Sequence, residues 1–135
     1  MNRLILSTLM LVLPLLASAY DAEVDGINYY LIPEKDEAKV TFSRSGYPSS
    51  VNIPEKFTYE GVEYSVTCIG AFAFNSFGEY SNLTSVTIPN SVTSIGNSAF
   101  YNCSGLNSVH ITDLVAWCKI SFDYSNPLVY AHHLY

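Results

Sequence analysis

The chain repeats itself, and this internal repeat limits its possible folds more than any other feature. The segment Leu83–Ile88 (LTSVTI) returns further along the chain as Leu106–Ile111 (LNSVHI). An earlier match, at a wider spacing, joins Val51–Pro54 (VNIP) to Val86–Pro89 (VTIP). Recurrence on this scale is typical of repeat proteins, in which similar coils stack on one another.

A second part of the repeat matches at a third spacing. It consists of an Ile-Gly pair and an Ala-Phe pair, which occur at 69–70 and 73–74 and again at 95–96 and 99–100. The change in spacing implies insertions of nine residues between Pro54 and Ile69 and of three between Phe74 and Leu83. The chain is therefore predicted to contain one complete unit, an enlarged unit before it and the opening of a third.

The complete unit, residues 83–105, begins with the period-two alternation of a strand that has one buried face. This strand should end at Pro89, which has no N–H to donate. Val92–Ile95 suits a second short strand, and Asn97 or Ser98 can cap one helical turn. The predicted inward residues are Leu83, Val86, Ile88, Val92, Ile95, Ala99, Phe100 and Cys103. One unit cannot enclose this apolar set, whereas stacked units can, because each covers the open side of its neighbour.

The run L-x-x-V-x-I-P-x-x-V-T-x-I-G-x-x-A-F-x-x-C-x-x-L, from Leu83 to Leu106, resembles the BspA-like leucine-rich repeat. The enlarged unit departs from this pattern, because Phe77 stands where the repeat has its cysteine. The resemblance implies a mainly β fold with short helical turns, a leucine-rich-repeat solenoid of a bacterial surface or secreted protein. It also implies protein binding or adhesion, towards host matrix proteins or other cells, without catalytic residues and without a cofactor.

Residues 1–19 are predicted to be a signal peptide. Arg3 supplies the positive start, Leu4–Leu16 form an apolar run too short to span a bilayer, and Ala17-Ser18-Ala19 fits a signal-peptidase site. The protein is thus expected to be exported, to the extracellular space or the cell surface, with no membrane insertion once the signal is removed.

The rest of the chain is predicted to have three regions: an N-terminal β-hairpin cap (20–50), the leucine-rich repeats (51–111) and a C-terminal flank (112–135). The cap is a hairpin of Ile27–Ile32 with Lys39–Phe42, expected to cover the edge of the first unit. A second hairpin is predicted within Phe57–Tyr64 and a short helix at Asp113–Cys118. The tail Asn126–Tyr135 has no polar cap, so the chain is truncated, or the tail folds back or pairs with another chain.

Charge and composition narrow the range of partners. Six Lys and Arg stand against twelve Asp and Glu, a net charge of −6, which argues against nucleic acid and against a polybasic membrane dock. Hydrophobic residues make up 49% of the chain and charged residues 13%, which favours a folded domain over disorder. The partner that the resemblance implies is a protein ligand, on host matrix or on another cell surface.

The outward positions of the repeat strands are the candidate binding site. Six polar side chains, which occupy equivalent places in the repeat, should line one face of the stacked sheet: Ser50, Asn52, Ser85, Thr87, Ser108 and His110. Repeat proteins commonly bind partners on their concave surfaces. The alternative, that these are solvated strand residues without a partner, stays open.

Two tyrosines and two histidines are further candidates for sites. Tyr59 and Tyr64 can anchor an interface or simply pack across the second hairpin. The adjacent His132 and His133 should point to opposite faces of a strand, and neither the histidine nor the cysteine spacing fits a metal site.

The cysteines do not indicate catalysis. Cys103 occupies a core position of the repeat and is predicted to be a buried free thiol rather than a disulfide partner of Cys118. Cys68 has no apparent neighbouring base to activate it as a nucleophile.

Three functions from different classes follow from these observations. The first is a non-catalytic secreted or cell-surface leucine-rich-repeat protein that mediates protein binding or adhesion. The second is a structural spacer, a fragment of a larger surface protein. The third is a secreted hydrolase of unknown type, which requires titratable groups that converge on a pocket. The scattered carboxylates of this chain do not point to such a site.

Overall fold

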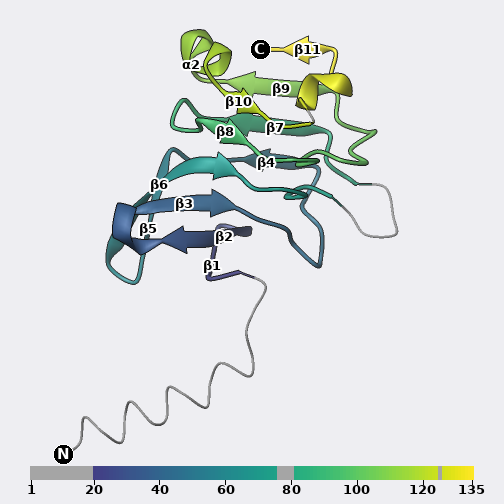
Figure 1. Ribbon diagram of the computed structural model, residues 1–135. Coiled ribbons are helices and arrows are strands. Elements are labelled where there is room, and N and C mark those ends of the chain that lie inside the picture. The colour runs from purple at the N-terminus through teal and green to yellow at the C-terminus, as the bar shows by residue number, and fades with distance from the viewer. Residues whose placement is uncertain (1–19, 76–80, 125) are drawn as a thin grey trace, which may run out of the picture.

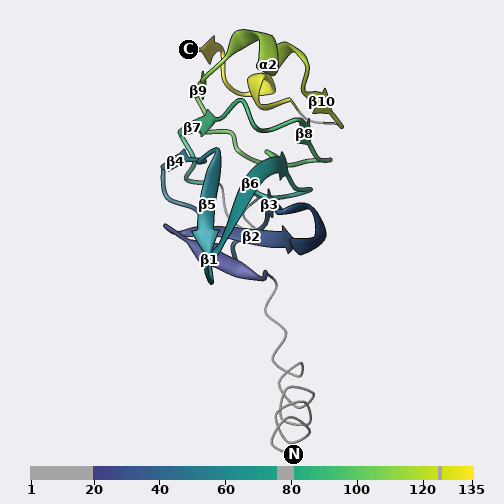
Figure 2. The ribbon, with the colours of Figure 1, turned by 90° about the vertical axis from the view of Figure 1, so that its left-hand side faces the viewer.

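The computed structural model describes residues 20–75, 81–124 and 126–135, and there the chain winds into a solenoid that builds two sheets (Figure 1). The four-stranded sheet, here the short sheet, consists of β4 (Ser50–Asn52), β7 (Ser85–Ile88), β9 (Ser108–Ile111) and β11 (His133–Leu134). The seven-stranded sheet, here the long sheet, has as its parallel part β3 (Glu37–Val40), β6 (Val62–Ile69), β8 (Ser94–Ile95) and β10 (Ser121–Phe122). Figure 2 shows the two sheets as neighbouring columns of strands.

The mainly β solenoid expected from the repeat is confirmed. The predicted signal peptide and the departure at Phe77 lie outside the described residues.

Parallel pairing in register places equivalent residues of successive coils side by side. In the short sheet the aligned residues are Val51, Val86, Val109 and Leu134. In the long sheet they are Val40, Ile69, Ile95 and Phe122. These two columns belong to one core between the sheets, so each coil buries apolar surface of the next.

The core contains the residues that the repeat predicted. All eight inward residues of the complete unit are buried, and none is more than 1% exposed. Phe100 stacks on Phe74 of the preceding coil with ring centroids 5.0 Å apart. The Cys103 thiol donates to the carbonyl of the same Phe74 across 3.4 Å. The repeated Phe and Cys positions therefore join successive coils as well as filling one.

The corner after Gly96 differs from the prediction. Instead of one helical turn there are tight turns, with Ala99 N–H donating to the Gly96 carbonyl and Tyr101 N–H to the Ser98 carbonyl. Ser98 has a φ of 55° and Asn102 a φ of 64°, both in the left-handed region that a right-handed helix excludes. Ala99 and Phe100 still point inward, so the different backbone leaves the core positions unchanged.

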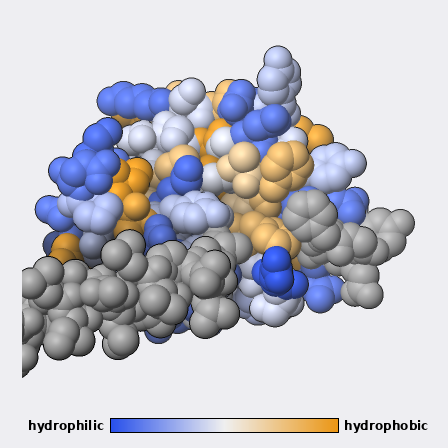
Figure 3. Space-filling view, turned by 60° about the horizontal axis from the view of Figure 1, so that its bottom comes forward, coloured by the Kyte–Doolittle hydropathy of each residue, from blue (hydrophilic) through white to orange (hydrophobic). Residues whose placement is uncertain are grey.

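The N-terminal hairpin extends the long sheet alone. β2 (Ile27–Ile32) pairs antiparallel with β3, as predicted, and β1 (Ala22–Val24), which the sequence did not reveal, pairs antiparallel with β2. β3 lies parallel to β6, so the hairpin covers the first coil on one sheet only, and β4 remains the edge strand of the short sheet. The second predicted hairpin is confirmed as β5 (Lys56–Tyr59) with β6. Figure 3 brings this end forward and shows hydrophobic residues in separate groups among hydrophilic ones.

The C-terminal flank folds back on the repeats. The predicted helix is α2 (Leu114–Cys118), which begins with the Asp113 carboxylate accepting from the Ala116 N–H across 2.6 Å. β11 then pairs with β9, and the backbone of Tyr135 continues this pairing with hydrogen bonds to Val109 and Ile111. The tail therefore packs on the last repeat as a further parallel strand of the short sheet, and the truncation suggested by the sequence stays a prediction.

Successive coils approach closely at Gly96, where an added Cβ would lie 2.8 Å from the backbone nitrogen of Ala71. We expect Gly96→Ala to lower the free energy of unfolding by about 1–3 kcal/mol, because the new methyl group forces two coils apart. Gly105→Ala is the matched control. Its Cβ would meet nothing closer than the Leu83 carbonyl at 3.6 Å, so the expected change is within about 0.5 kcal/mol. Urea unfolding followed by circular dichroism measures both, and equal losses would contradict this close approach.

Tyr29 is fully buried beside Phe57, and its hydroxyl has no hydrogen-bond partner in the part of the chain that the structure describes. Burial raises the pKa of Tyr29 above the usual value of 10.0, whereas the unfolded chain releases this proton near that value. The free energy of unfolding should therefore fall as the pH rises past 10.0. We expect Tyr29→Phe to be at least as stable as the wild type at neutral pH and to lose less stability in alkali.

Tyr47→Phe is the comparison for this prediction. Burial raises the pKa of Tyr47 to about 12, but its hydroxyl also accepts from the Asn28 N–H and donates to the Thr41 carbonyl. Tyr47→Phe should therefore cost about 1–3 kcal/mol at neutral pH. Urea titrations at about pH 7 and about pH 10.5 lie below and above the pKa of tyrosine in the unfolded chain. A neutral-pH loss for Tyr29→Phe as large as that for Tyr47→Phe would contradict the unpartnered hydroxyl.

Candidate functional site

The predicted binding residues are brought together as two aligned rows on the short sheet, here called the polar strip. One row is Ser50, Ser85 and Ser108, and the other is Asn52, Thr87 and His110. Each residue is the direct partner of its neighbour in the row, so their backbones are spaced about 4.8 Å apart. The valine between the two rows is buried in all three strands, which turns both rows outward.

The polar groups of the strip are available to a partner. Ser50 and Asn52 are exposed, and the other four residues are half-buried. Within the described residues, none of the six side chains makes a hydrogen bond to the rest of the chain. Hydroxyl, amide and imidazole groups offer both donors and acceptors, so this surface can bind polar groups without carrying a formal charge of its own.

The structure extends the strip by residues that the sequence reasoning missed. β11 places His133 beside Ser108, and the ring of Tyr135 stacks on His110 with centroids 5.0 Å apart. His133 lies next to the same tyrosine ring, at 6.1 Å. The sequence signal for β11 is the alternation of polar and apolar residues in His133-Leu134-Tyr135. Because this segment lacks the Ile-Pro pair of the repeat, the sequence alone does not identify it as the fourth strand of the short sheet.

The other candidate residues are placed as follows. Tyr64 is buried and its ring lies 5.9 Å from Phe57, so its role is packing across the hairpin, and Tyr59 is half-buried. His132 and His133 are both exposed. No group of three or more His, Cys, Asp or Glu that could hold a metal ion occurs among the described residues.

All three cysteines are free thiols, and they differ in exposure. Cys103 is buried, Cys68 is half-buried and Cys118 is exposed, so the alternative of a Cys103–Cys118 disulfide is not what the structure shows. Burial raises the pKa of the Cys103 thiol, and a hydrogen bond with the Ser81 side chain offsets part of that effect. Cys103 is therefore a protonated core residue rather than a nucleophile.

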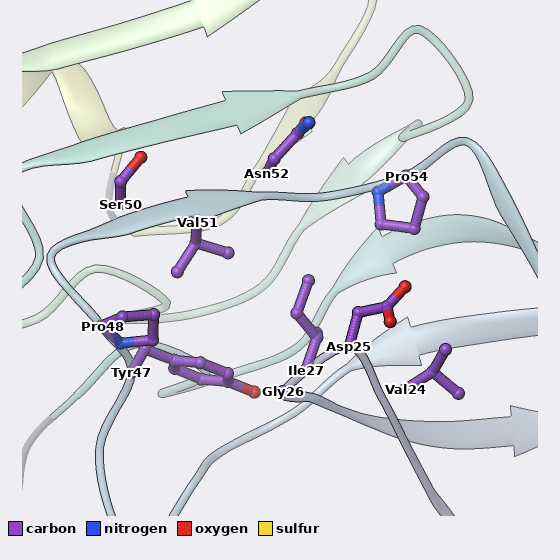
Figure 4. A pocket seen from close by; sticks show the side chains of 10 residues that line it. All are labelled: Val24, Asp25, Gly26, Ile27, Tyr47, Pro48, Ser50, Val51, Asn52 and Pro54. Atoms are coloured by element: carbon purple, nitrogen blue, oxygen red, sulfur yellow. The ribbon is translucent and has the colours of Figure 1, made fainter.

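Among the cavities lined by described residues, two lie at the margins of the solenoid. One of about 370 Å³ lies between β4 and the turn that joins β1 to β2, and it includes Val51, Tyr47 and Asp25 (Figure 4). The other, of about 240 Å³, lies against α2 and includes Asp113 and Lys119. Each holds one carboxylate. No helix within the described residues is long and apolar enough to cross a membrane.

Short parallel strands stacked in register, each with one apolar and one polar face, define a solenoid repeat protein. The family model of the BspA type leucine rich repeat region, with six copies, matches residues 67–128. The chain belongs to this BspA-type leucine-rich-repeat family. Among proteins with curated descriptions, none matches the sequence.

Solved structures similar to this chain include three bacterial proteins. A leucine rich cell surface protein from Faecalibacterium prausnitzii is 25% identical over 87% of this chain and 33% of that one, with a TM-score of 0.59. A leucine-rich repeat protein from Bacteroides ovatus is 37% identical over 70% of this chain and 24% of that one, with a TM-score of 0.60. A leucine-rich repeat protein from Bacteroides capillosus is 27% identical over 84% of this chain and 97% of that one, with a TM-score of 0.59.

The chain spans a third of the first of these proteins and a quarter of the second, but nearly all of the third. The family and the three neighbours are described as repeat or cell-surface proteins, not as enzymes. Proteins built on stacked repeats typically bind other proteins.

The difference in exposure of the cysteines predicts their order of reaction with a thiol reagent. In the native protein we expect Cys118 to react rapidly and Cys103 to react only on unfolding, because a buried, protonated thiol is protected. Labelling with 5,5′-dithiobis(2-nitrobenzoic acid) followed by peptide mass spectrometry identifies each site. Cys118→Ser is the control that should remove the rapid phase. Rapid native labelling of Cys103 would contradict its burial.

Proposed function

We propose that this chain is a non-catalytic, exported protein of the bacterial cell surface that binds a protein partner through the polar strip. The observation that carries the proposal is the alignment of Ser50, Ser85 and Ser108 in one row and of Asn52, Thr87 and His110 in the next. These side chains are held by a rigid ladder, so binding costs little ordering of the receptor side.

Export is supported by the sequence and by one relative. The segment from Arg3 through Leu4–Leu16 to Ala17-Ser18-Ala19 has the three parts of a signal peptide. The similar protein of Faecalibacterium prausnitzii is described as a cell surface protein. A partner outside the bacterium, such as a host matrix protein or the surface of another cell, fits this location.

The chemistry of the described residues favours binding over catalysis. The cavity beside β4 contains Asp25 as its one titratable carboxylate, and the cavity beside α2 contains Asp113. Glycoside hydrolysis, for example, typically needs a pair of carboxyl groups that flank one substrate. The polar strip instead offers hydroxyl, amide and imidazole groups spread along the short sheet, which suits an extended protein surface.

The direct test is capture of a panel of purified extracellular-matrix proteins by the immobilised chain. The strip variant combines Ser85→Ala, Thr87→Ala, Ser108→Ala and His110→Ala. Loss of four hydrogen-bonding groups at about 0.5–1.5 kcal/mol each should weaken binding at least about tenfold.

The matched control for that test is Ser94→Ala with Ser121→Ala. These two residues form a row on the long sheet, so the control removes hydroxyl groups from strands of the same kind on the other sheet. We expect it to change the affinity by less than about threefold. Capture by the strip variant that equals capture by the wild type would reject the polar strip as the binding face.

A further inference from the structure

The short sheet has an open edge at β4. The long sheet continues past β6 with β3, β2 and β1, whereas β4 pairs only with β7 among the described strands. The next strand position on the short sheet is occupied by no strand of the described residues. Natural proteins usually cover or blunt such an edge, since its unpaired backbone groups can pair with another chain.

The backbone groups at this edge can be identified. The Ile53 N–H donates to the Thr87 carbonyl and the Ser49 carbonyl accepts from the Ser85 N–H, so these odd-numbered residues of the β4 segment face β7. Successive residues of a strand direct their N–H and C=O groups to opposite sides. The N–H and C=O groups of Ser50 and Asn52 therefore point to the open side.

A preformed cavity runs along the same edge. Its volume is about 370 Å³, and Figure 4 shows Val51 and Ile27 pointing into it, with Ser50 and Asn52 directed to the other side of β4. Pro48 and Tyr47 lie at one end and Pro54 and Asp25 at the other. The cavity thus combines a row of unpaired backbone groups with an apolar floor.

The walls of this cavity are fixed before any partner binds. The Tyr47 hydroxyl accepts from the Asn28 N–H and donates to the Thr41 carbonyl, and its ring lies 5.1 Å from that of Phe74. Asp25 and Gly26 both have positive φ, 50° and 78°, as in the tight turn of a two-residue hairpin. Such preorganisation reduces the entropy that binding costs.

We propose that the β4 edge binds an extended segment of a partner protein by strand addition. Backbone groups of the segment pair with Ser50 and Asn52, one apolar side chain enters the cavity against Val51 and Ile27, and a Lys or Arg faces Asp25. This goes beyond the proposed function, because the polar strip acts through side chains on the face of the sheet whereas this site acts through backbone at its edge.

Charge decides which occupant fits. Asp25 is the one charged residue that lines the cavity, and no basic residue accompanies it. A second copy of this chain, paired β4 to β4, would bring the same cavity lining, whose one charged residue is again Asp25. A segment from a partner that carries Lys or Arg supplies that group.

The test begins with selection of displayed random heptapeptides on the immobilised full chain. Enriched peptides are synthesised, and their dissociation constants are measured by fluorescence polarisation. We expect alternating apolar residues with one Lys or Arg. We also expect the amides of Ser50 and Asn52 to exchange hydrogen more slowly when the peptide is bound.

Three variants locate the binding. Asn52→Pro removes one edge N–H while leaving the pairing to β7 intact, and should weaken the peptides at least about tenfold. Asn52→Thr keeps the N–H and gives position 52 the same side chain as its partner Thr87 on β7. It should change the affinity for the peptides by less than about threefold. Asp25→Asn tolerates the positive φ but removes the charge, and should weaken Lys- or Arg-containing peptides about three- to tenfold. Circular dichroism confirms that each variant is folded.

Several outcomes would overturn the proposal. They are no enrichment over an uncoated surface, equal affinity for Asn52→Pro or Asp25→Asn, and unchanged exchange of the edge amides. Peptides that lose affinity for the strip variant but not for Asn52→Pro would place binding on the polar strip, which rejects the edge and leaves the proposed function standing. A dimer in sedimentation that Asn52→Pro abolishes would make a second copy the occupant.

Discussion

The structure depends on parallel pairing of successive coils in one register. Because Val86 lies beside both Val51 and Val109, each coil covers apolar surface that the previous coil leaves open. The same register sets the outer face, where it aligns hydroxyl and amide side chains into rows. A shift of one residue would exchange the two faces, burying polar groups and exposing valines. Core and candidate binding face are therefore two consequences of a single constraint.

Sequence reasoning identified the parts of the fold that repeat. The spacings between the repeated segments predicted which residues of β4, β7 and β9 pair, since each match compares equivalent positions of adjacent coils. β3 and β11 were not recognised as members of the two columns. Both have alternating residues but lack the Ile-Pro and Ile-Gly pairs, so their partners depend on contacts distant in sequence. The corner at Ser98 was misjudged because its left-handed backbone has no side-chain signature.

The two candidate surfaces differ in how far sequence could reveal them. The polar strip follows from periodicity, because every member occupies the same place in its unit. The cavity beside β4 joins an N-terminal turn at Asp25, a loop residue, Tyr47, and a repeat strand. No spacing relates these three, and the open edge exists only because the hairpin extends one sheet and not the other. Such a site requires the tertiary structure.

The most direct measurement is a set of methyl nuclear Overhauser effects in protein labelled at valine. Strands stacked in register lie about 4.8 Å apart, so the methyl groups of Val86 should show direct effects to those of Val51 and of Val109. Val51 and Val109 should show none to each other, since Val86 lies between them. Absence of both Val86 contacts, or a direct Val51–Val109 contact, would contradict the stacking on which the core and both candidate binding sites depend.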